Sequence, residues 1–254
     1  MKLLGKLIRK LLLICLVLIL VPAGWFTLKG YTRYKEAVEK RPFSVMVQEI
    51  ENRPDFVPYD ALPSIYIDAV ISVEDRRFGS HPGIDPIAIG RALLVDIQTM
   101  SLKEGGSTIT QQLMKNQYFD QNKKLDRKTA EVFAALAFEK SYNKDEIFAL
   151  YVNTIYFGDG YYGIAQASQG YFGKTVDQLT EAEAVILAGL PQAPSAYSPT
   201  TAPDLAYQRM QQVLEKMIDN DVIDIEKAQH IQEEVHASFF CYMERKQTKN
   251  LFLI

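Results

Sequence analysis

The sequence has few of the residues that mark a metal cluster or a disulfide framework. Its 254 residues include two cysteines and three histidines. Cys15 lies in an apolar run and Cys241 near the C-terminus, so neither a disulfide framework nor a cysteine metal site is expected. No repeat or low-complexity segment occurs. The hydrophobic fraction of 48% and the charged fraction of 23% are those of a globular protein, which excludes a disordered, a collagen-like or a polytopic membrane chain.

Basic residues are scarce beyond the N-terminal segment. Residues 1–40 contain eight Lys and Arg against two Glu, which leaves 20 basic and 29 acidic residues in the rest of the chain. The folded part therefore offers no basic stripe, and we expect no nucleic-acid partner.

A long uncharged stretch lies near the N-terminus. Four basic residues among the first ten precede the 18 uncharged residues Leu11–Leu28. As a helix this stretch covers about 27 Å, close to the hydrocarbon thickness of a bilayer. The positive-inside rule then predicts a cytoplasmic tail over 1–10, a single transmembrane anchor over 11–28 and an extracytoplasmic remainder. A cleaved signal peptide is the alternative, because Val21-Pro22-Ala23 offers small residues at a suitable spacing.

Prolines punctuate the segment that follows the apolar run. Residues 29–63 are polar and contain Pro42, Pro54, Pro58 and Pro63, which predicts an irregular stalk or linker. We expect the folded domain over 64–235. The tail over 236–254 mixes apolar and charged residues, and we assign it no role.

Helix signals dominate the expected domain, and strand signals are scarce. Asp85 before Pro86 predicts the start of a helix that ends near Leu102. Further helix starts are expected at the Asn143–Glu146 and Thr180–Glu183 capping boxes, at Pro203 and at Asp224. The chain is therefore predicted to be mostly α-helical.

The segment Glu74–Gly83 places acidic side chains where packing does not require them. An apolar helix end runs directly into Glu74 and Asp75. A carboxylate at such a junction lies at the wall of a cleft, where partial burial raises its pKa toward the range of a general base. The alternative is a surface acidic pair neutralised by the two arginines that follow. His81 is expected to fix the loop by hydrogen bonding.

A glycine-rich turn opens the next helix. The sequence Gly105-Gly106-Ser107 leaves backbone N–H groups free at a helix start, an arrangement that suits an anion such as phosphate. Thr108, Gln112 and Lys115 follow at i, i+4 and i+7 and share one face, which can bind sugar hydroxyls and a phosphate. A capped amphipathic helix with a solvated polar face is the alternative. The Gly-Lys-Ser/Thr ending of a nucleotide-binding loop is absent.

A third stretch pairs Arg127 with Glu131 on one helix face. The helix beyond them is apolar on both sides, with Ala134, Ala135 and Phe138 next to the pair. We therefore expect both side chains to line an interior or cleft surface. The alternative is an exposed ion pair worth about 0.3–0.5 kcal/mol.

These three stretches resemble the motifs of peptidoglycan glycosyltransferases, the transglycosylases that form the first catalytic domain of class A penicillin-binding proteins or occur as monofunctional enzymes. The signatures are E-D-x-x-F-x-x-H-x-G at Glu74–Gly83, G-S-T-x-T-Q-Q-x-x-K-N at Gly106–Asn116 and R-K-x-x-E at Arg127–Glu131. Weaker matches continue to Gln192, and the resemblance covers about residues 64–220. Because no S-x-x-K transpeptidase domain follows, we expect the monofunctional form.

The resemblance implies an all-α, lysozyme-like fold with a smaller, mobile lobe near the membrane. It also implies a reaction in which lipid II, a disaccharide-peptide on undecaprenyl diphosphate, is polymerised into β-1,4-linked glycan strands with inversion. The expected place is the outer side of a bacterial cytoplasmic membrane. Expected partners are lipid II, the nascent glycan chain and other cell-wall synthesis or division proteins.

The same resemblance implies a role for each motif residue. Glu74 is the general base that takes the proton of the acceptor 4-hydroxyl. Lys115 and Arg127 surround the donor diphosphate, and Glu131 either holds a divalent metal, Mg²⁺ or Mn²⁺, or orients this cationic pair. The remaining assignments are Ser107, Thr108 and Gln112 to substrate binding, Asp75, Phe78 and His81 to shaping the motif, and Tyr151 to supporting the fold behind the cleft.

Two other functions compete with this interpretation. A lysozyme-like lytic enzyme also uses a cleft glutamate on glycan, but it has no need of a diphosphate site or a permanent anchor. An inactive membrane-anchored scaffold is the second alternative, although every motif residue that carries chemistry is present.

Overall fold

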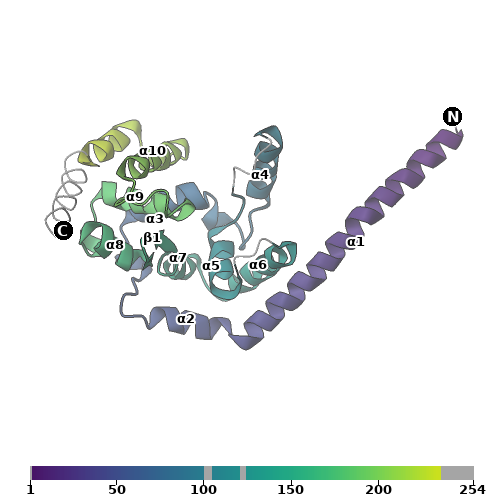
Figure 1. Ribbon diagram of the computed structural model, residues 1–254, viewed down its shortest axis with the longest axis horizontal. Coiled ribbons are helices and arrows are strands. Elements are labelled where there is room, and N and C mark those ends of the chain that lie inside the picture. The colour runs from purple at the N-terminus through teal and green to yellow at the C-terminus, as the bar shows by residue number, and fades with distance from the viewer. Residues whose placement is uncertain (1, 100–104, 121–123, 236–254) are drawn as a thin grey trace.

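The computed structural model describes residues 2–99, 105–120 and 124–235 and consists almost entirely of helices (Figure 1). The helices are α1 (Lys2–Lys40), α2 (Phe43–Glu51), α3 (Ser64–Glu74), α4 (Pro86–Thr99), α5 (Ile109–Tyr118), α6 (Leu125–Phe138), α7 (Lys144–Val152), α8 (Ile164–Phe172), α9 (Glu181–Gly189) and α10 (Pro203–Asp219), with short 3₁₀ turns η1 (Tyr59–Ala61), η2 (Phe78–Ser80), η3 (Val176–Gln178) and η4 (Leu190–Gln192). Residues 225–235 form a further helix. The predicted all-α fold class is confirmed.

The described strands form one small antiparallel hairpin. Strand β1 (Tyr156–Gly158) pairs with β2 (Tyr161–Tyr162), and Asp159 at the tip has a φ of 52°. The hairpin packs against η4, close to the helices that carry the core. It is too short to form a sheet layer of its own.

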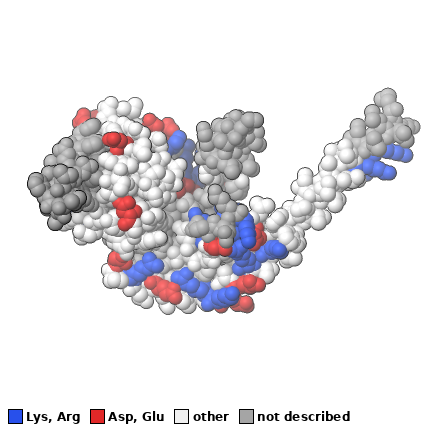
Figure 2. All heavy atoms as spheres, viewed as in Figure 1, with Lys and Arg blue, Asp and Glu red and all other residues white. Residues whose placement is uncertain are grey.

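Helix α1 extends from the body as a long rod (Figure 1). The part from Arg9 to Lys40 is long and apolar enough to cross a membrane, and its most apolar window is fully exposed. In the space-filling view the middle of α1 carries neither acidic nor basic colour, and Lys and Arg lie toward its N-terminal end (Figure 2). The predicted apolar N-terminal helix is confirmed, although the helix is much longer than 11–28.

The prediction of an irregular stalk over 29–63 is wrong for residues 29–51, whereas residues 52–63 consist of turns and the short η1. Helix α1 continues without interruption to Lys40, and α2 follows with Met46, Val47 and Ile50 buried in the core. The prolines that suggested a stalk stand at the junctions between helices, since Pro42 and Pro63 directly precede α2 and α3. At a helix start the fixed φ of proline is compatible with the helix, and its missing N–H removes no helical hydrogen bond. These prolines therefore mark helix starts rather than disorder.

The C-terminal part of α1 packs along α6. Gly30 is buried against Thr129, where a Cβ atom would overlap the Thr129 side chain. Arg33 forms ion pairs with Asp126 and Asp120, both with N–O distances near 3 Å. Tyr34 stacks on Phe133 with ring centroids 6.3 Å apart. This non-local packing stabilises a segment whose own sequence is mostly polar.

Helix α9 forms the centre of the core. Its residues from Ala182 to Gly189 are all buried, and α3 and α10 pack on it and on each other. Three alanines and Gly189 allow this close approach, and a Cβ at Gly189 would lie 2.9 Å from Arg209 Cγ. A second group of helices packs through α5, which contacts α6 and α7. The two groups meet at the end of α3.

Local capping signals predicted the helix starts well. Asp85 Oδ1 accepts from the backbone N–H groups of Ile87 and Ala88 at 2.9 Å, and α4 begins at Pro86. The remaining predicted starts are confirmed by the two capping boxes before α7 and α9, by Pro203 in the first turn of α10 and by the Asp224 cap of the 225–235 helix. The predicted end near Leu102 and the tail 236–254 lie outside the described residues.

Candidate active site

A cleft of about 430 Å³ opens where α3, α5, η4 and α10 meet. Its lining is mostly polar: Val73, Glu74, Gly105, Ser107, Gln111, Gln112, Lys115, Pro191, Gln192 and Arg209. Four of the residues predicted from the sequence motifs, Glu74, Ser107, Gln112 and Lys115, thus lie in one cavity. Among the described residues of this lining Glu74 is the only carboxylate, and it faces two cationic side chains.

Glu74 is the last residue of α3. The chain leaves the helix at Asp75, whose φ is −159°, so the Glu74 side chain projects from a helix end into the cleft. Gln112 donates from Nε2 to Glu74 Oε2 at 2.7 Å. Tyr151 in turn donates to Gln112 Oε1 at 3.3 Å.

The surroundings of Glu74 act on its pKa in opposite directions. Burial raises the pKa of the carboxyl, and the neighbouring Asp75 adds to this. The Gln112 hydrogen bond and the positive charges of Arg209 and Lys115 lower the pKa. Burial prevails, so the pKa of Glu74 lies above its ordinary value, which is the direction that a general base at neutral pH requires.

Both cationic side chains of the cleft are also partly shielded from water. Burial lowers the pKa of the Lys115 ammonium and of the Arg209 guanidinium. Arg209 is held by a bond from Nε to the Gly189 carbonyl at 3.2 Å and lies 5.8 Å from the Tyr197 ring centroid. Positive charge at fixed positions in a partly enclosed cleft is suited to an anionic ligand.

Asp75 and His81 lie behind the cleft and fix its wall. The buried Asp75 accepts from the backbone N–H of Ile109 at 3.0 Å and lies 2.9 Å from His81 Nε2. Gly83 N–H donates to His81 Nδ1 at 3.3 Å, so the proton of the neutral ring is on Nε2 and points at Asp75. Phe78 is buried against Phe148 at 6.2 Å. These contacts tie the end of α3 to the start of α5.

Thr108 does not lie in the cleft lining. It is the N-cap of α5, where its hydroxyl accepts from Gln111 N–H at 3.1 Å and donates to the Gly83 carbonyl at 2.7 Å. The helical spacing that placed Thr108 on the face of Gln112 and Lys115 fails because a capping residue is not helical and turns its side chain back to the backbone. Its buried hydroxyl is engaged in structural bonds.

Arg127 and Glu131 lie on α6, outside the lining of the cleft, where Glu131 is 1% exposed. The expected buried position is therefore correct for Glu131. Arg127 pairs with Glu131 Oε1, and Lys128 Nζ lies 3.2 Å from Glu131 Oε2. Lys128 also donates to Ser107 Oγ at 2.6 Å, which connects α6 to the glycine-rich turn at the cleft.

The Glu131 carboxylate does not fit the role of a metal ligand. Both of its oxygens are engaged by cationic side chains, Arg127 on one and Lys128 on the other. Within the described parts of the chain, no three His, Cys, Asp or Glu side chains are grouped so as to hold a metal ion. Of the two roles that the resemblance allows, these contacts fit the orientation of cations, and we assign no step to Mg²⁺ or Mn²⁺.

Motif reading missed several residues near the cleft. Arg209 is far from the motifs in the chain and reaches Glu74 only because α10 packs on α3 and α9. Gln111 was not predicted as a cleft residue because its side chain belongs to the capping box of α5. Its buried Nε2 has no hydrogen-bond partner among the described atoms. Lys128 is the second residue of the R-K-x-x-E pattern, and its positive charge is the sequence feature that could have identified it.

Residues 42–218 match the protein family described as transglycosylase. The chain belongs to the transglycosylase family. The resemblance stated from the sequence motifs is thereby confirmed, together with the expectation that this chain is an enzyme of that family. The match begins directly before α2, so the transglycosylase domain starts earlier than residue 64, where we expected it.

Several relatives of this transglycosylase are similar over most of its length. A candidate transglycosylase of Cupriavidus necator is 45% identical over 166 residues, which are 65% of this chain and 71% of that protein. Penicillin-binding protein 1A of Neisseria flavescens is 42% identical over 191 residues, 75% of this chain and 24% of the relative. The chain thus spans about a quarter of that relative's length. The crystal structure of penicillin-binding protein 1A from Haemophilus influenzae has 26% identity and a TM-score of 0.43, covering 70% of this chain and 17% of that one.

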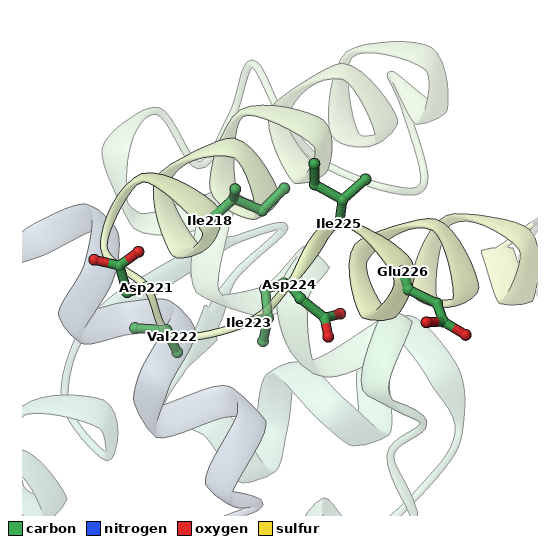
Figure 3. Close-up of a pocket in the computed structure, with 7 residues that line it drawn as sticks. All are labelled: Ile218, Asp221, Val222, Ile223, Asp224, Ile225 and Glu226. Carbon is green, nitrogen blue, oxygen red and sulfur yellow. The ribbon is translucent and has the colours of Figure 1, made fainter.

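The transglycosylase has a second hollow, which differs from the cleft in charge. It has a volume of about 620 Å³ and lies at the turn between α10 and the 225–235 helix (Figure 3). Its lining consists of Ile218, Asp221, Val222, Ile223, Asp224, Ile225 and Glu226, with no basic residue. Such a surface does not suit a phosphorylated ligand, so the cleft at Glu74 remains the candidate active site.

Proposed function

We propose that this transglycosylase polymerises lipid II into β-1,4-linked glycan strands, with Glu74 as the general base. The observation that carries the proposal is the Glu74 carboxylate in a cleft of about 430 Å³, hydrogen-bonded to Gln112 and faced by Lys115 and Arg209. One base and several cations are what glycosyl transfer from a diphosphate donor requires. Membership of the family supports the same reaction.

In the proposed step, the acceptor sugar's 4-hydroxyl oxygen attacks the anomeric carbon of the donor. The new C–O bond forms as the bond from that carbon to the diphosphate oxygen breaks, with inversion. The hydroxyl proton passes to a Glu74 oxygen, and undecaprenyl diphosphate leaves with the electron pair of the broken bond. Burial raises the pKa of Glu74, which makes the carboxylate a stronger base, while Gln112 and the two cations favour its ionised form.

Cationic side chains take up the charge that develops on the leaving diphosphate. Lys115 lies in the cleft itself. We propose that Arg127 and Lys128 on α6 supply further positive charge from outside the cleft lining. The buried Glu131 pairs with both of these side chains, and Lys128 also donates to Ser107 beside the glycine-rich turn. Because the cations are already oriented, little reorganisation is needed as the bond breaks.

The anchor suits a lipid-linked substrate. Helix α1 packs on α6, the element that carries Arg127, Lys128 and Glu131. We propose that α1 holds this charged end of the cleft beside the outer surface of the bacterial cytoplasmic membrane, where the diphosphate of lipid II lies. The nascent glycan strand then grows away from the membrane.

The test is the incubation of the purified full-length protein in detergent with labelled lipid II, followed by separation of products by size and digestion with a muramidase. We expect a ladder of digestible glycan polymer. Shortening of added glycan strands, with lipid II unchanged, would instead assign the cleft to a lytic enzyme. Bound but unconverted lipid II over a range of detergents would contradict any catalytic role.

A further inference from the structure

Three polar side chains from three helices form a series that ends at Glu74. Tyr151 on α7 donates its hydroxyl to Gln112 Oε1 at 3.3 Å, and Gln112 on α5 donates from Nε2 to Glu74 Oε2 at 2.7 Å. The Tyr151 side chain is fully buried, so it lies behind the cleft rather than in it. It does not belong to the lining that a substrate would meet.

The two ends of a glutamine amide differ in hydrogen bonding but hardly in shape. One end accepts through oxygen and the other donates through nitrogen, so packing alone does not decide which end faces a neighbour. If Gln112 turned over, its carbonyl oxygen would face the Glu74 carboxylate, and two acceptors would oppose each other. Something must therefore select the orientation that places the N–H on Glu74.

The Tyr151 hydroxyl is a suitable selector because it is a dependable donor. Burial and the nearby carboxylate of Glu74 raise the pKa of Tyr151 well above its ordinary value, so the phenol stays protonated at every working pH. A protonated phenol that meets the amide oxygen leaves the amide nitrogen to face the carboxylate. In the reversed orientation the phenol oxygen would accept from the amide N–H, and the buried phenol proton would lose the acceptor that the Gln112 oxygen provides.

We propose that Tyr151 is a positioning residue, which acts through Gln112 to keep an N–H donor on the catalytic carboxylate. The inference rests on the proposed role of Glu74 as the base. Loss of the Tyr151 hydroxyl frees the amide to turn over, and Glu74 then loses the donor that stabilises its ionised form. The base stays protonated to higher pH, so the reaction slows on the acid side.

The other groups that act on Glu74 are unchanged by this loss. They are Asp75 next to it, Lys115 on α5 and Arg209 on α10. Tyr66 supplies a matched control, because it is also fully buried and close to Glu74, while its hydroxyl has no hydrogen-bond partner among the described atoms. Tyr66→Phe and Tyr151→Phe remove the same atom from the same kind of site.

The experiment measures the pH profile of lipid II polymerisation by the full-length wild type, Tyr151→Phe and Tyr66→Phe proteins. For Tyr151→Phe we expect about a tenfold loss of rate on the acid limb and little loss on the alkaline plateau, since a donor bond to a charged group is worth about that much. Tyr66→Phe should follow the wild type. In a Gln112→Met background, Tyr151→Phe should have no further effect.

A second readout is independent of turnover. The ionisation of Glu74 is followed by NMR of the full-length protein with ¹³C-labelled glutamate, and the signal is assigned by its absence in Glu74→Gln. A midpoint that moves upward in Tyr151→Phe alone supports the inference even if no polymer forms, in which case the proposed function fails and the positioning role stands. An equal loss of rate at every pH, an equal shift in Tyr66→Phe, or an unmoved Glu74 midpoint would overturn it.

Discussion

At the scale of single residues, the charge of Glu74 opposes the stability of the fold. The carboxylate is enclosed by α3, α5 and α10, and burial raises its pKa. In the unfolded chain the same group ionises at its ordinary, lower pKa. Between these two pKa values the unfolded chain has lost the proton while the folded protein retains it, so stability falls as the pH rises.

The first prediction follows from this loss of stability with rising pH. Glu74→Gln keeps the shape of the side chain and an acceptor for Gln112 but removes the charge. Below the ordinary pKa of glutamate the variant and the wild type should be equally stable. Above the raised pKa of Glu74 the variant should be more stable, by about 1.4 kcal/mol for each unit of the shift. Denaturant unfolding at a series of pH values checks this, and equal stability of the two proteins at every pH would contradict it.

Thr108 gives a second prediction, because its position in the structure and its motif assignment lead to different outcomes. Thr108→Val removes the cap of α5 and the bond to the Gly83 carbonyl. The expected cost is about 1–2 kcal/mol of stability, while Thr108→Ser should cost far less because it keeps the hydroxyl. Thermal unfolding of both variants measures the effect. An increased KM for lipid II with unchanged stability would restore Thr108 to the substrate site.

At the scale of elements, the sequence predicted what depends on neighbours in the chain. Capping side chains bond backbone groups two or three residues away, so the starts of α4, α7 and α9 were readable, and Pro203 in the first turn marked the start of α10. The continuation of α1 to Lys40 was not readable, because it depends on Gly30, Arg33 and Tyr34 meeting α6 about a hundred residues later. The same reason explains why Arg209 was missed. The motifs located Glu74, Gln112 and Lys115 because their spacing on α3 and α5 is local.

The contact of α1 with α6 yields a third prediction. Gly30→Ala introduces a Cβ into the Thr129 side chain, whereas Gly24→Ala on the same helix meets no atom within 4 Å. Alanine favours a helix over glycine by about 1 kcal/mol at either place. Gly24→Ala should therefore be neutral or stabilising, and Gly30→Ala should lose about 1–3 kcal/mol through overpacking. Unfolding of the full-length protein in detergent compares them, and equal stability would mean that the helices do not pack at Gly30.

At the scale of the whole molecule, α1 has two parts with different surroundings. Residues before Pro22 are exposed wherever the structure describes their burial, and the part from Phe26 onward contacts α6, for example through the Phe26 carbonyl and Thr129 Oγ1 at 3.2 Å. The anchor is thus continuous with the helix that packs beside the cations of α6. One continuous helix thus joins the exposed apolar segment to the part that packs on α6.

This division predicts the outcome of two deletions. Removal of residues 2–22 should leave the melting temperature of the body unchanged, since it removes only the part outside the α6 contact. Removal of residues 2–40 uncovers Phe133 and the other α6 residues that pack on α1, and the melting temperature should fall by several degrees. Calorimetry of both proteins provides the comparison. A stable body after the longer deletion would show that α1 is a tether without a structural role.

The most direct test of the account compares Glu74→Gln with the wild type for binding and for turnover of lipid II. The variant should bind lipid II with nearly wild-type affinity and form glycan polymer at least a hundredfold more slowly, because a general base contributes about 10²–10⁴ to rate. Polymerisation by Glu74→Gln at the wild-type rate would contradict the assignment of the base, and with it the chemistry proposed for the cleft.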